Sequence, residues 1–360
     1  MFIEIMKNFS LQLFAEAGSL VNTTTGHVDA YTGTANATGA MSGELKTFYD
    51  TELLENARVE LFYAQFAKKQ ALPANHGKTV EWRKWNTFAK AGQLQEGVIP
   101  TGQTFGMSSK TGVINQYGTY ATVSDTLEMR AYDDVILGAT EEMGASAAET
   151  QETLIRDALL VNTNVLYCDN IDLATGKSTG TPNGCGEMNA SATTISLLTP
   201  AMIAKAVTKM KKDRVPTING KYYAVVSPSV AHDLRQHEAW IEAHKYAHPE
   251  EIYNGEIGEL HGVRFIENVF APILGGEYQN EAGGVTYATY FFGKDAFGII
   301  DPEGGALEMI IKDKSQVGGP LNQFSTIGYK FETNGATMLY PERVLRVMSC
   351  SSYSGIDEEN

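Results

Sequence analysis

Several groups of residues in this chain are of types that can do chemistry, and one loop is the first of them. The run TGKSTG at 175–180 resembles a phosphate-binding loop. That motif needs a glycine five positions before Gly176, where this chain has Ile171, and no strand is predicted to lead into it. The spacing therefore argues against a nucleotide site.

Histidines gather between positions 232 and 248. His237 and Glu238 begin like a zinc-protease helix, but the second histidine of that motif would stand at the position of Ile241. His244 and His248 are four residues apart and would share a metal ion if both were helical, but the proline that follows them indicates that the helix ends. Exposed surface is the better interpretation of this group.

Nucleophiles and carboxylates give no stronger signal. Cys168, Cys185 and Cys350 form no Cys-x-x-Cys pair and stand at no strand-to-helix elbow, a pattern typical of a reducing compartment. Ser227 precedes a proline and is explained as a helix cap. Paired acids such as 133–134 suit a solvated helical face. We therefore expect no enzymatic activity, no cofactor and no metal ion.

Composition and charge narrow the function further. The chain has 360 residues, with 28 Lys and Arg against 43 Asp and Glu, for a formal net charge of −15. This surplus repels phosphate and argues against a dedicated nucleic-acid reader, although a local basic face is compatible with the average. No run is apolar enough to span a membrane, and charges interrupt the N-terminal MFIEIMKNFSLQLFAEAG, unlike a signal peptide. We expect the chain to fold in a cytoplasm.

Residues 1–43 are predicted to be a flexible arm and residues 44–77 to contain an N-terminal helix. Thr and Gly supply 11 of the 26 residues from 18 to 43, so this segment buries too little apolar surface to order itself. Helical spacing of apolar residues then predicts a helix from Glu44 to about Lys69.

Residues 78–126 are predicted to form an extended β-hairpin. Val80 and Trp82 alternate with polar residues, and a second β-rich run covers 111–125. Strands of about thirteen residues would reach about 40 Å, and an isolated two-stranded ribbon is at best marginally stable. The hairpin therefore needs another surface. Trp82 and Trp85 would either contact a neighbouring chain or pack on the long helix of their own subunit.

The strongest helical signal covers 133–167. Apolar and small residues from Ile136 to Val165 keep to one face, and acidic residues at the start suit the positive end of the helix dipole. Thirty-odd residues make a rod of about 50 Å, longer than a typical globular helix. Residues 127–196 would therefore contain a spine helix and a polar, Gly-rich loop.

Residues 197–285 are predicted to form a compact α/β unit. It comprises, in order, a helix from Thr199–Pro200 to about Lys212, a strand at 221–227, a helix from Ser227–Pro228 that buries Trp240, and a strand at 262–269. Residues 286–360 are β-rich and end in an acidic tail that we expect to be frayed.

Seven stretches of the sequence resemble one known family. They are ELKTFYDTELLENA (44–57), GKTVEWRKWNTFAKA (77–91), LQEGVIPTGQ (94–103), NQYGTYATVSDTLE (115–128), NTNVLY (162–167), VVSPSVAHDLR (225–235) and LHGVRFIEN (260–268). With the element order, they resemble the Hong Kong 97 (HK97)-type fold of tailed-phage major capsid proteins, and more specifically the family typified by coliphage N-four. Asn162 stands where that family has glycine.

This resemblance implies an α+β fold with an N-arm, a β-hairpin E-loop (78–126), a spine helix (within 127–196), an α/β A-domain (197–285) and a β-rich P-domain (286–360). It implies hexamers and pentamers that tile an icosahedral shell around double-stranded DNA without sequence-specific contact, in a virion assembled in the host cytoplasm. Portal, scaffold or decoration proteins would be partners, and no membrane is involved. The candidate inter-subunit residues are Trp82, Trp85, Glu96, Pro100, Tyr117 and Tyr120.

Three other classes stay open. An encapsulin-type compartment has the same fold, but an N-arm in place of an N-terminal helix argues against it. The α/β unit would suit a small-molecule enzyme, but the sequence lacks a catalytic constellation. A host-surface adhesin would need the signal peptide that is missing.

Overall fold

The computed structural model describes most of the chain after residue 61. The described residues are 62–73, 77–86, 88–93, 96–97, 99, 102–131, 135–241, 258–303, 305, 307–317 and 321–360. Before residue 62 only the backbone of three short antiparallel strands is described: β1 (Leu20–Thr23), β2 (Gly26–Asp29) and β3 (Ala35–Asn36).

The chain forms two compact units, each assembled from separate stretches of sequence. Unit 1 consists of Met1–Val59, Gln116–Ala148 and Gly305–Glu332, and unit 2 of Glu60–Asn115, Glu149–Gly304 and Thr333–Asn360. Helices and strands occur in both units, which confirms the predicted α+β class.

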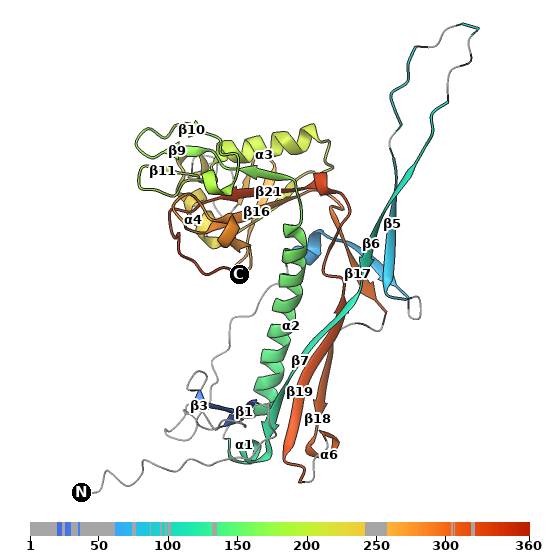
Figure 1. Cartoon of the computed structure of the whole chain (residues 1–360), viewed down its shortest axis with the longest axis vertical. Coiled ribbons are helices and arrows are strands. Elements are labelled where there is room, and N and C mark those ends of the chain that lie inside the picture. Colours follow the sequence, from blue (N-terminus) through green and yellow to red (C-terminus); the bar gives the residue numbers. More distant parts are fainter. Residues whose placement is uncertain are drawn as a thin grey trace. The chain divides into compact units, whose positions relative to one another are not determined.

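The core of unit 2 is a mixed seven-stranded sheet (Figure 1). Its order is β13 (Gly258–Leu260), β14 (Val263–Glu267), β12 (Tyr222–Val226), β16 (Thr286–Phe292), β21 (Val344–Ser349) and β8 (Val165–Tyr167), with β15 (Ile273–Leu274) also paired to β16. β12 and β14 are parallel and are connected through helix α4 (Pro228–Gln236), as the strand–helix–strand pattern predicts. The predicted boundary at residue 286 is wrong, because β16 and β21 pair into this same sheet.

Both faces of this sheet are covered, which explains its continuous apolar strands. Every residue of β16 is buried. Because successive side chains point to opposite faces, Tyr287 and Phe291 pack with α3 (Pro200–Lys212) and α4 on one face. Tyr290 and Phe292 pack on the other face with Ile155 of helix α2 (Val135–Leu160).

The two helices over the sheet start where the sequence predicts. The Thr199 hydroxyl accepts a hydrogen bond from the Met202 N–H at 3.4 Å, so α3 has its predicted cap. The Ser227 side chain makes no capping hydrogen bond, so its predicted capping role is not realised. Trp240 is buried as predicted, but it lies beyond the end of α4, because the backbone at His237 is extended.

A second sheet of unit 2 corrects the prediction for the first helix. It contains β20 (Thr337–Met338), β17 (Phe297–Pro302) and β4 (Lys68–Leu72). Instead of a helix to about Lys69, a 3-10 turn, η1 (Tyr63–Phe66), leads into β4, which pairs in parallel with β17. The rest of the predicted helix, 44–61, lies outside the described residues. Pairing with a strand distant in sequence therefore overrides the local helical spacing.

Helix α2 is the predicted spine helix, but it ends earlier than expected. It has 26 residues, or about 39 Å at 1.5 Å per residue, instead of about 50 Å. Beyond it, the Asn162 amide donates a hydrogen bond to the Val344 carbonyl oxygen at 2.7 Å, and β8 pairs with β21. The buried face also differs from the predicted stripe, because Val161 is 81% exposed while Ile155 and Glu152 are buried.

Residues 168–196, predicted to be a loop, contain a small sheet. Its strands are β9 (Asn170–Asp172), β10 (Ser178–Gly180) and β11 (Thr194–Ile195). The expectation that no strand precedes TGKSTG is wrong, since β9 does, but the last three residues of the run form β10 in place of the helix that a phosphate loop requires. Further short 3-10 helices are η2 (Cys185–Glu187), η3 (Gly276–Tyr278) and η4 (Pro341–Arg343).

The acidic tail is held against unit 2 rather than frayed. The Asp357 carboxylate accepts hydrogen bonds from the Tyr287 hydroxyl at 2.6 Å and the Ser229 hydroxyl at 3.0 Å. The Ser352 N–H donates to the Asp233 carboxylate at 2.9 Å. Neutral donors distant in sequence therefore hold one of the tail's acidic side chains, Asp357, against the subunit.

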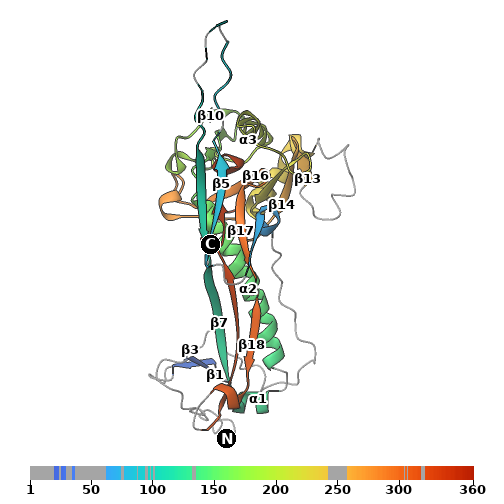
Figure 2. The ribbon, with the colours of Figure 1, turned by 90° about the vertical axis from the view of Figure 1, so that its right-hand side faces the viewer.

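Unit 1 is built on a three-stranded sheet with β19 (Phe324–Thr333) between β18 (Glu308–Lys312) and β7 (Asn115–Ser124) (Figure 2). Helix α1 (Asp125–Arg130) follows β7, and the Ser124 hydroxyl caps it by accepting from the Leu127 N–H at 3.3 Å. Helix α6 (Lys314–Val317) lies close to α1, since Lys314 Nζ is 3.1 Å from the Glu128 carboxylate. Leu127 and Ile327 are buried in the small core of this unit.

Candidate assembly surface

Strands β5 (Thr79–Trp85) and β6 (Met107–Val113) form an antiparallel hairpin, and residues 77–113 are here called the hairpin arm (Figure 1). The predicted hairpin is confirmed, but each strand has seven residues rather than about thirteen. The strands therefore reach about 23 Å instead of about 40 Å. The second predicted strand is interrupted because β7 pairs with β19 rather than continuing the hairpin.

The inner face of the hairpin arm packs on strands of its own unit. The Trp82 ring lies over Gly298 of β17 and Gly112 of β6, where an added Cβ would stand 2.9 Å and 2.8 Å from it. On the same strand, Lys84 Nζ lies 3.4 Å from the Glu342 carboxylate. Trp82 therefore packs within the subunit, but on strands and not on the long helix that one alternative expected.

The outer face of the hairpin arm carries an aromatic cluster, defined here as Trp85, Phe88 and Phe105. These side chains are 64%, 59% and 65% exposed. Phe105 joins the other two, with centroids 5.5 Å from the Trp85 ring and 6.2 Å from the Phe88 ring. Met107, opposite Trp85 in the ladder, is also exposed. Contiguous apolar surface of this kind is typical of an interaction site.

Glu96 and Pro100 belong to the segment that connects the two strands. Glu96 is exposed and precedes Gly97, whose φ of +77° favours glycine. Pro100 lies outside the described residues. A role for either residue in subunit contact stays a prediction.

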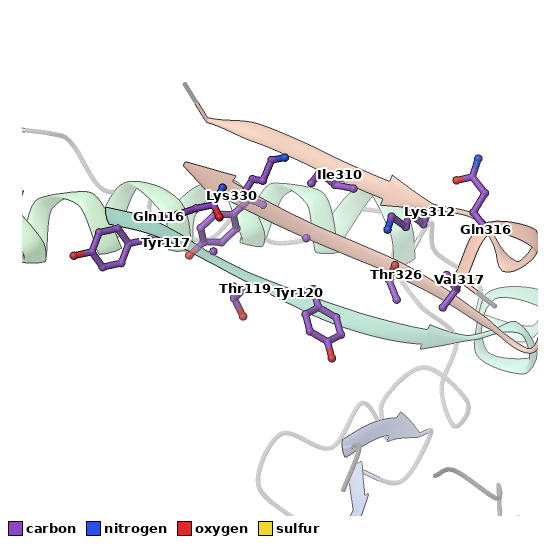
Figure 3. Close-up of a pocket in the computed structure, with 13 residues that line it drawn as sticks. Gln116, Tyr117, Thr119, Tyr120, Ile310, Lys312, Gln316, Val317, Thr326 and Lys330 are labelled. Atoms are coloured by element: carbon purple, nitrogen blue, oxygen red, sulfur yellow. The ribbon is translucent and has the colours of Figure 1, made fainter. Parts of the chain in front are cut away.

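Tyr117 and Tyr120 lie on β7 in unit 1, not on the hairpin arm. Tyr117 is half-buried and stacks on Phe331 with centroids 5.8 Å apart, whereas Tyr120 is 72% exposed. Both line an open groove of about 550 Å³ over β7, β18 and β19 (Figure 3). Lys312 and Lys330 also line this groove, so it is more polar than the aromatic cluster.

The six predicted contact residues therefore occupy different surroundings. Trp82 and Trp85 share β5 and lie on its opposite faces, whereas Tyr117 and Tyr120 share β7 in the other unit. Phe88 and Phe105 were not among the predicted contact residues. The signal that could have found them is two aromatic residues in a Gly-punctuated stretch, where little else is available to bury a ring.

Glu152 is a buried carboxylate for which the sequence predicted no role. It holds the first described residues of unit 2 in place. Glu152 Oε1 accepts hydrogen bonds from the Phe62 N–H at 3.0 Å, the Tyr63 N–H at 3.2 Å and the Asn268 amide at 3.0 Å. Its Oε2 is buried without a partner among the described residues. Burial raises the pKa of Glu152, although the three hydrogen bonds oppose this shift. Glu152 thus ties η1 to helix α2.

The described residues offer little reactive chemistry. They contain no group of three or more His, Cys, Asp and Glu side chains placed to hold a metal ion. The three cysteines are buried and unpaired, and burial raises the pKa of the Cys350 thiol to about 12. His232 packs on the Tyr353 ring, and the predicted pair His244 and His248 lies outside the described residues.

Among the helices described, none has the length and hydropathy to cross a membrane.

Comparison with known proteins identifies the family. Residues 108–329, more than half of the chain, match a family described as phage capsid protein. No curated protein matched the sequence. Among solved structures, the cyanophage Pam1 capsid is similar with a TM-score of 0.65 at 13% identity, covering 89% of this chain and 100% of that chain.

Two further capsid structures are similar over nearly their whole length. The capsid of the Helicobacter pylori bacteriophage KHP30 has a TM-score of 0.63 at 11% identity, covering 87% of this chain and 98% of that chain. The capsid of cyanophage P-SCSP1u has a TM-score of 0.60 at 15% identity, covering 88% and 96%. These matches confirm the predicted HK97-type fold. The chain belongs to the phage capsid protein family and is a structural protein of the capsid shell.

Proposed function

We propose that the chain is the major subunit of a tailed-phage head, in which hexamers and pentamers tile an icosahedral shell around double-stranded DNA. The observation that carries this proposal is the aromatic cluster, in which three large rings stay exposed among the described residues. Each ring removes roughly 150–250 Å² from water when it is buried. A neighbouring subunit is the surface that would bury them.

In this proposal the hairpin arm corresponds to the E-loop, α2 to the spine helix and the seven-stranded sheet to the A-domain. The shell would assemble in the host cytoplasm, with portal, scaffold or decoration proteins as partners, and would contact DNA without sequence specificity. The chain would have no catalytic activity. The narrower resemblance to the N-four capsid family stays a prediction.

The proposal is tested by expressing the full chain and following particle formation by sedimentation and negative-stain microscopy. Wild-type protein should form capsomer rings or closed particles. The double variant Trp85→Ala with Phe105→Ala should remain small, because it removes most of the aromatic cluster, while its thermal unfolding stays close to that of wild type.

A matched control removes exposed apolar side chains elsewhere in unit 2. Leu173 and Val269 are 51% and 70% exposed and lie outside the hairpin arm. The double variant Leu173→Ala with Val269→Ala should assemble like wild type. A wild-type chain that stays a stable monomer at high concentration contradicts the shell proposal, and normal assembly of the Trp85 and Phe105 variant contradicts the role of the arm.

A further inference from the structure

The charge of this acidic chain is divided unevenly along the sequence. Between Lys68 and Val113 there are seven Lys and Arg residues and two Asp and Glu residues, a net charge of +5. The remaining residues carry 21 basic and 41 acidic side chains, a net charge of −20. The segment that contains β4 and the hairpin arm is therefore basic in a strongly acidic protein.

All seven basic side chains of this segment are exposed. Arg83 pairs with Glu81 on the same strand, and Lys84 pairs with Glu342. The other five, Lys68, Lys69, Lys78, Lys90 and Lys110, form no ion pair with a described residue.

Ion pairs within the subunit also hold some of the cations elsewhere in the described chain. Lys205 lies 2.9 Å from Asp169, Arg235 lies 2.7 Å from Glu267, and Lys330 lies 2.9 Å from Glu308. The basic segment therefore differs from the rest of the described chain in its excess of exposed basic over acidic residues, and not in how often its cations form ion pairs.

We infer that the basic segment docks on an acidic face of a second copy of this chain, with its lysines selecting and steering the contact that the aromatic cluster then buries. The inference rests on the proposed function and adds the chemistry of the partner surface. The net −20 of the remaining chain supplies the complementary charge on every copy. Opposite potentials speed encounter and suppress wrong pairings, and they act most strongly at low salt.

A nucleic-acid partner fits the same segment less well. Exposed aromatic residues with cations can bind single strands by stacking bases on open ring faces. Here the rings contact one another at interplanar angles of 58° and 63°, and the exposed aliphatic side chains Met107 and Val113 lie on the adjoining ladder. Such a mixed apolar surface is better matched by protein than by bases or a phosphate backbone.

The test compares two triple charge reversals in the full chain. Lys78→Glu, Lys90→Glu and Lys110→Glu change the arm, and the matched control Lys177→Glu, Lys211→Glu and Lys212→Glu changes exposed lysines elsewhere by the same charge. Self-association is measured by sedimentation from about 0.05 M to about 0.5 M NaCl. We expect the arm variant to associate at least about 10-fold more weakly at low salt and the control to stay within about 2-fold of wild type.

Each other result overturns the inference. Wild-type association of the arm variant, or equal weakening of both variants, would remove any specific role for the arm lysines. So would normal association of the arm variant together with loss of its binding to a random DNA duplex, which would assign the lysines to nucleic acid. If the Trp85 and Phe105 variant fails to assemble while the arm charge variant assembles normally, the shell role stands and only the electrostatic inference fails.

Discussion

Strands β5 and β16 are both seven residues long and both rich in aromatic side chains, yet they have opposite roles. In β16, TYATYFF, every residue is buried, because helices cover one face of its sheet and α2 with η1 covers the other. In β5, TVEWRKW, no residue is fully buried. Aromatic content therefore does not separate a core strand from a contact strand. The number of layers packed on the strand does.

This difference decides which equilibrium each aromatic side chain stabilises. Rings of β16 are already removed from water in the single subunit, so they stabilise its folded state. Rings on the outer face of the hairpin arm are buried only after association, so they contribute to assembly. The following predictions test this division, from the largest expected effect to the smallest.

The same deletion in the two regions should differ by several kcal/mol. Phe291→Ala removes a ring that is 0% exposed and should lower the free energy of unfolding by about 3–5 kcal/mol through the cavity it leaves. Phe88→Ala on the arm is the matched control and should change it by less than about 0.5 kcal/mol. Denaturant unfolding measures both. Similar losses for the two variants would show that the arm is part of the subunit core.

Replacing Glu152 should destabilise the junction between η1 and α2. Glu152→Ala leaves the Phe62 and Tyr63 N–H groups and the Asn268 amide without their acceptor, which should cost about 1–3 kcal/mol. Glu152→Gln keeps an oxygen that can accept at the Oε1 position and should lose much less. An equal loss for both variants would contradict this assignment.

The pH dependence of the free energy of unfolding provides a second, independent test of Glu152. Because burial raises the folded-state pKa of Glu152 above its unfolded value, the stability it contributes is fully present below the unfolded pKa and is lost as pH rises through the folded pKa. Wild type should therefore lose stability relative to Glu152→Gln across that rise. Unfolding measured over a pH series checks this, and the opposite slope would refute it.

A larger residue under Trp82 should weaken the packing of the hairpin arm on its unit without unfolding the sheet. An added Cβ at Gly298 would stand 2.9 Å from the Trp82 ring, so Gly298→Ala should displace the ring and cost about 1–2 kcal/mol. Hydrogen exchange should become faster in β5 and stay unchanged in β16. Gly144→Ala in α2, where nothing lies within 4 Å of the added atom, is the control and should be neutral or stabilising.

Asp357 in the C-terminal tail should have the smallest effect on stability. Its pH dependence should be opposite to that of Glu152. Burial raises the pKa of Asp357, but hydrogen bonds from Ser354, Tyr287 and Ser229 outweigh it and hold the pKa below its ordinary value. Its contribution is present above the unfolded pKa and is lost as pH falls through the folded pKa. Protection of the tail from hydrogen exchange should therefore decrease in acid in wild type, and should be low at every pH in Asp357→Asn.

Local features of the fold could be predicted from the sequence because neighbouring residues determine them. Thr199 and Pro200 start α3 at the expected residue, since a cap needs only its own turn. The alternation in TVEWRKW produces β5, and Trp82 and Trp85, three residues apart, lie on opposite faces of it as strand geometry requires. Seven stretches between residues 44 and 268, together with the order of the elements, predicted the capsid fold that the comparisons confirm.

Only the tertiary structure decided which partner each local element found. Residues 68–72 became a strand because β17 lies beside them, and β16 and β21 joined the sheet of the preceding α/β unit because hydrogen bonding between strands ignores sequence distance. It also placed Trp82 on Gly298 and left Trp85 exposed. The sequence determined that the two rings face apart, but only packing determined which face is covered within the subunit.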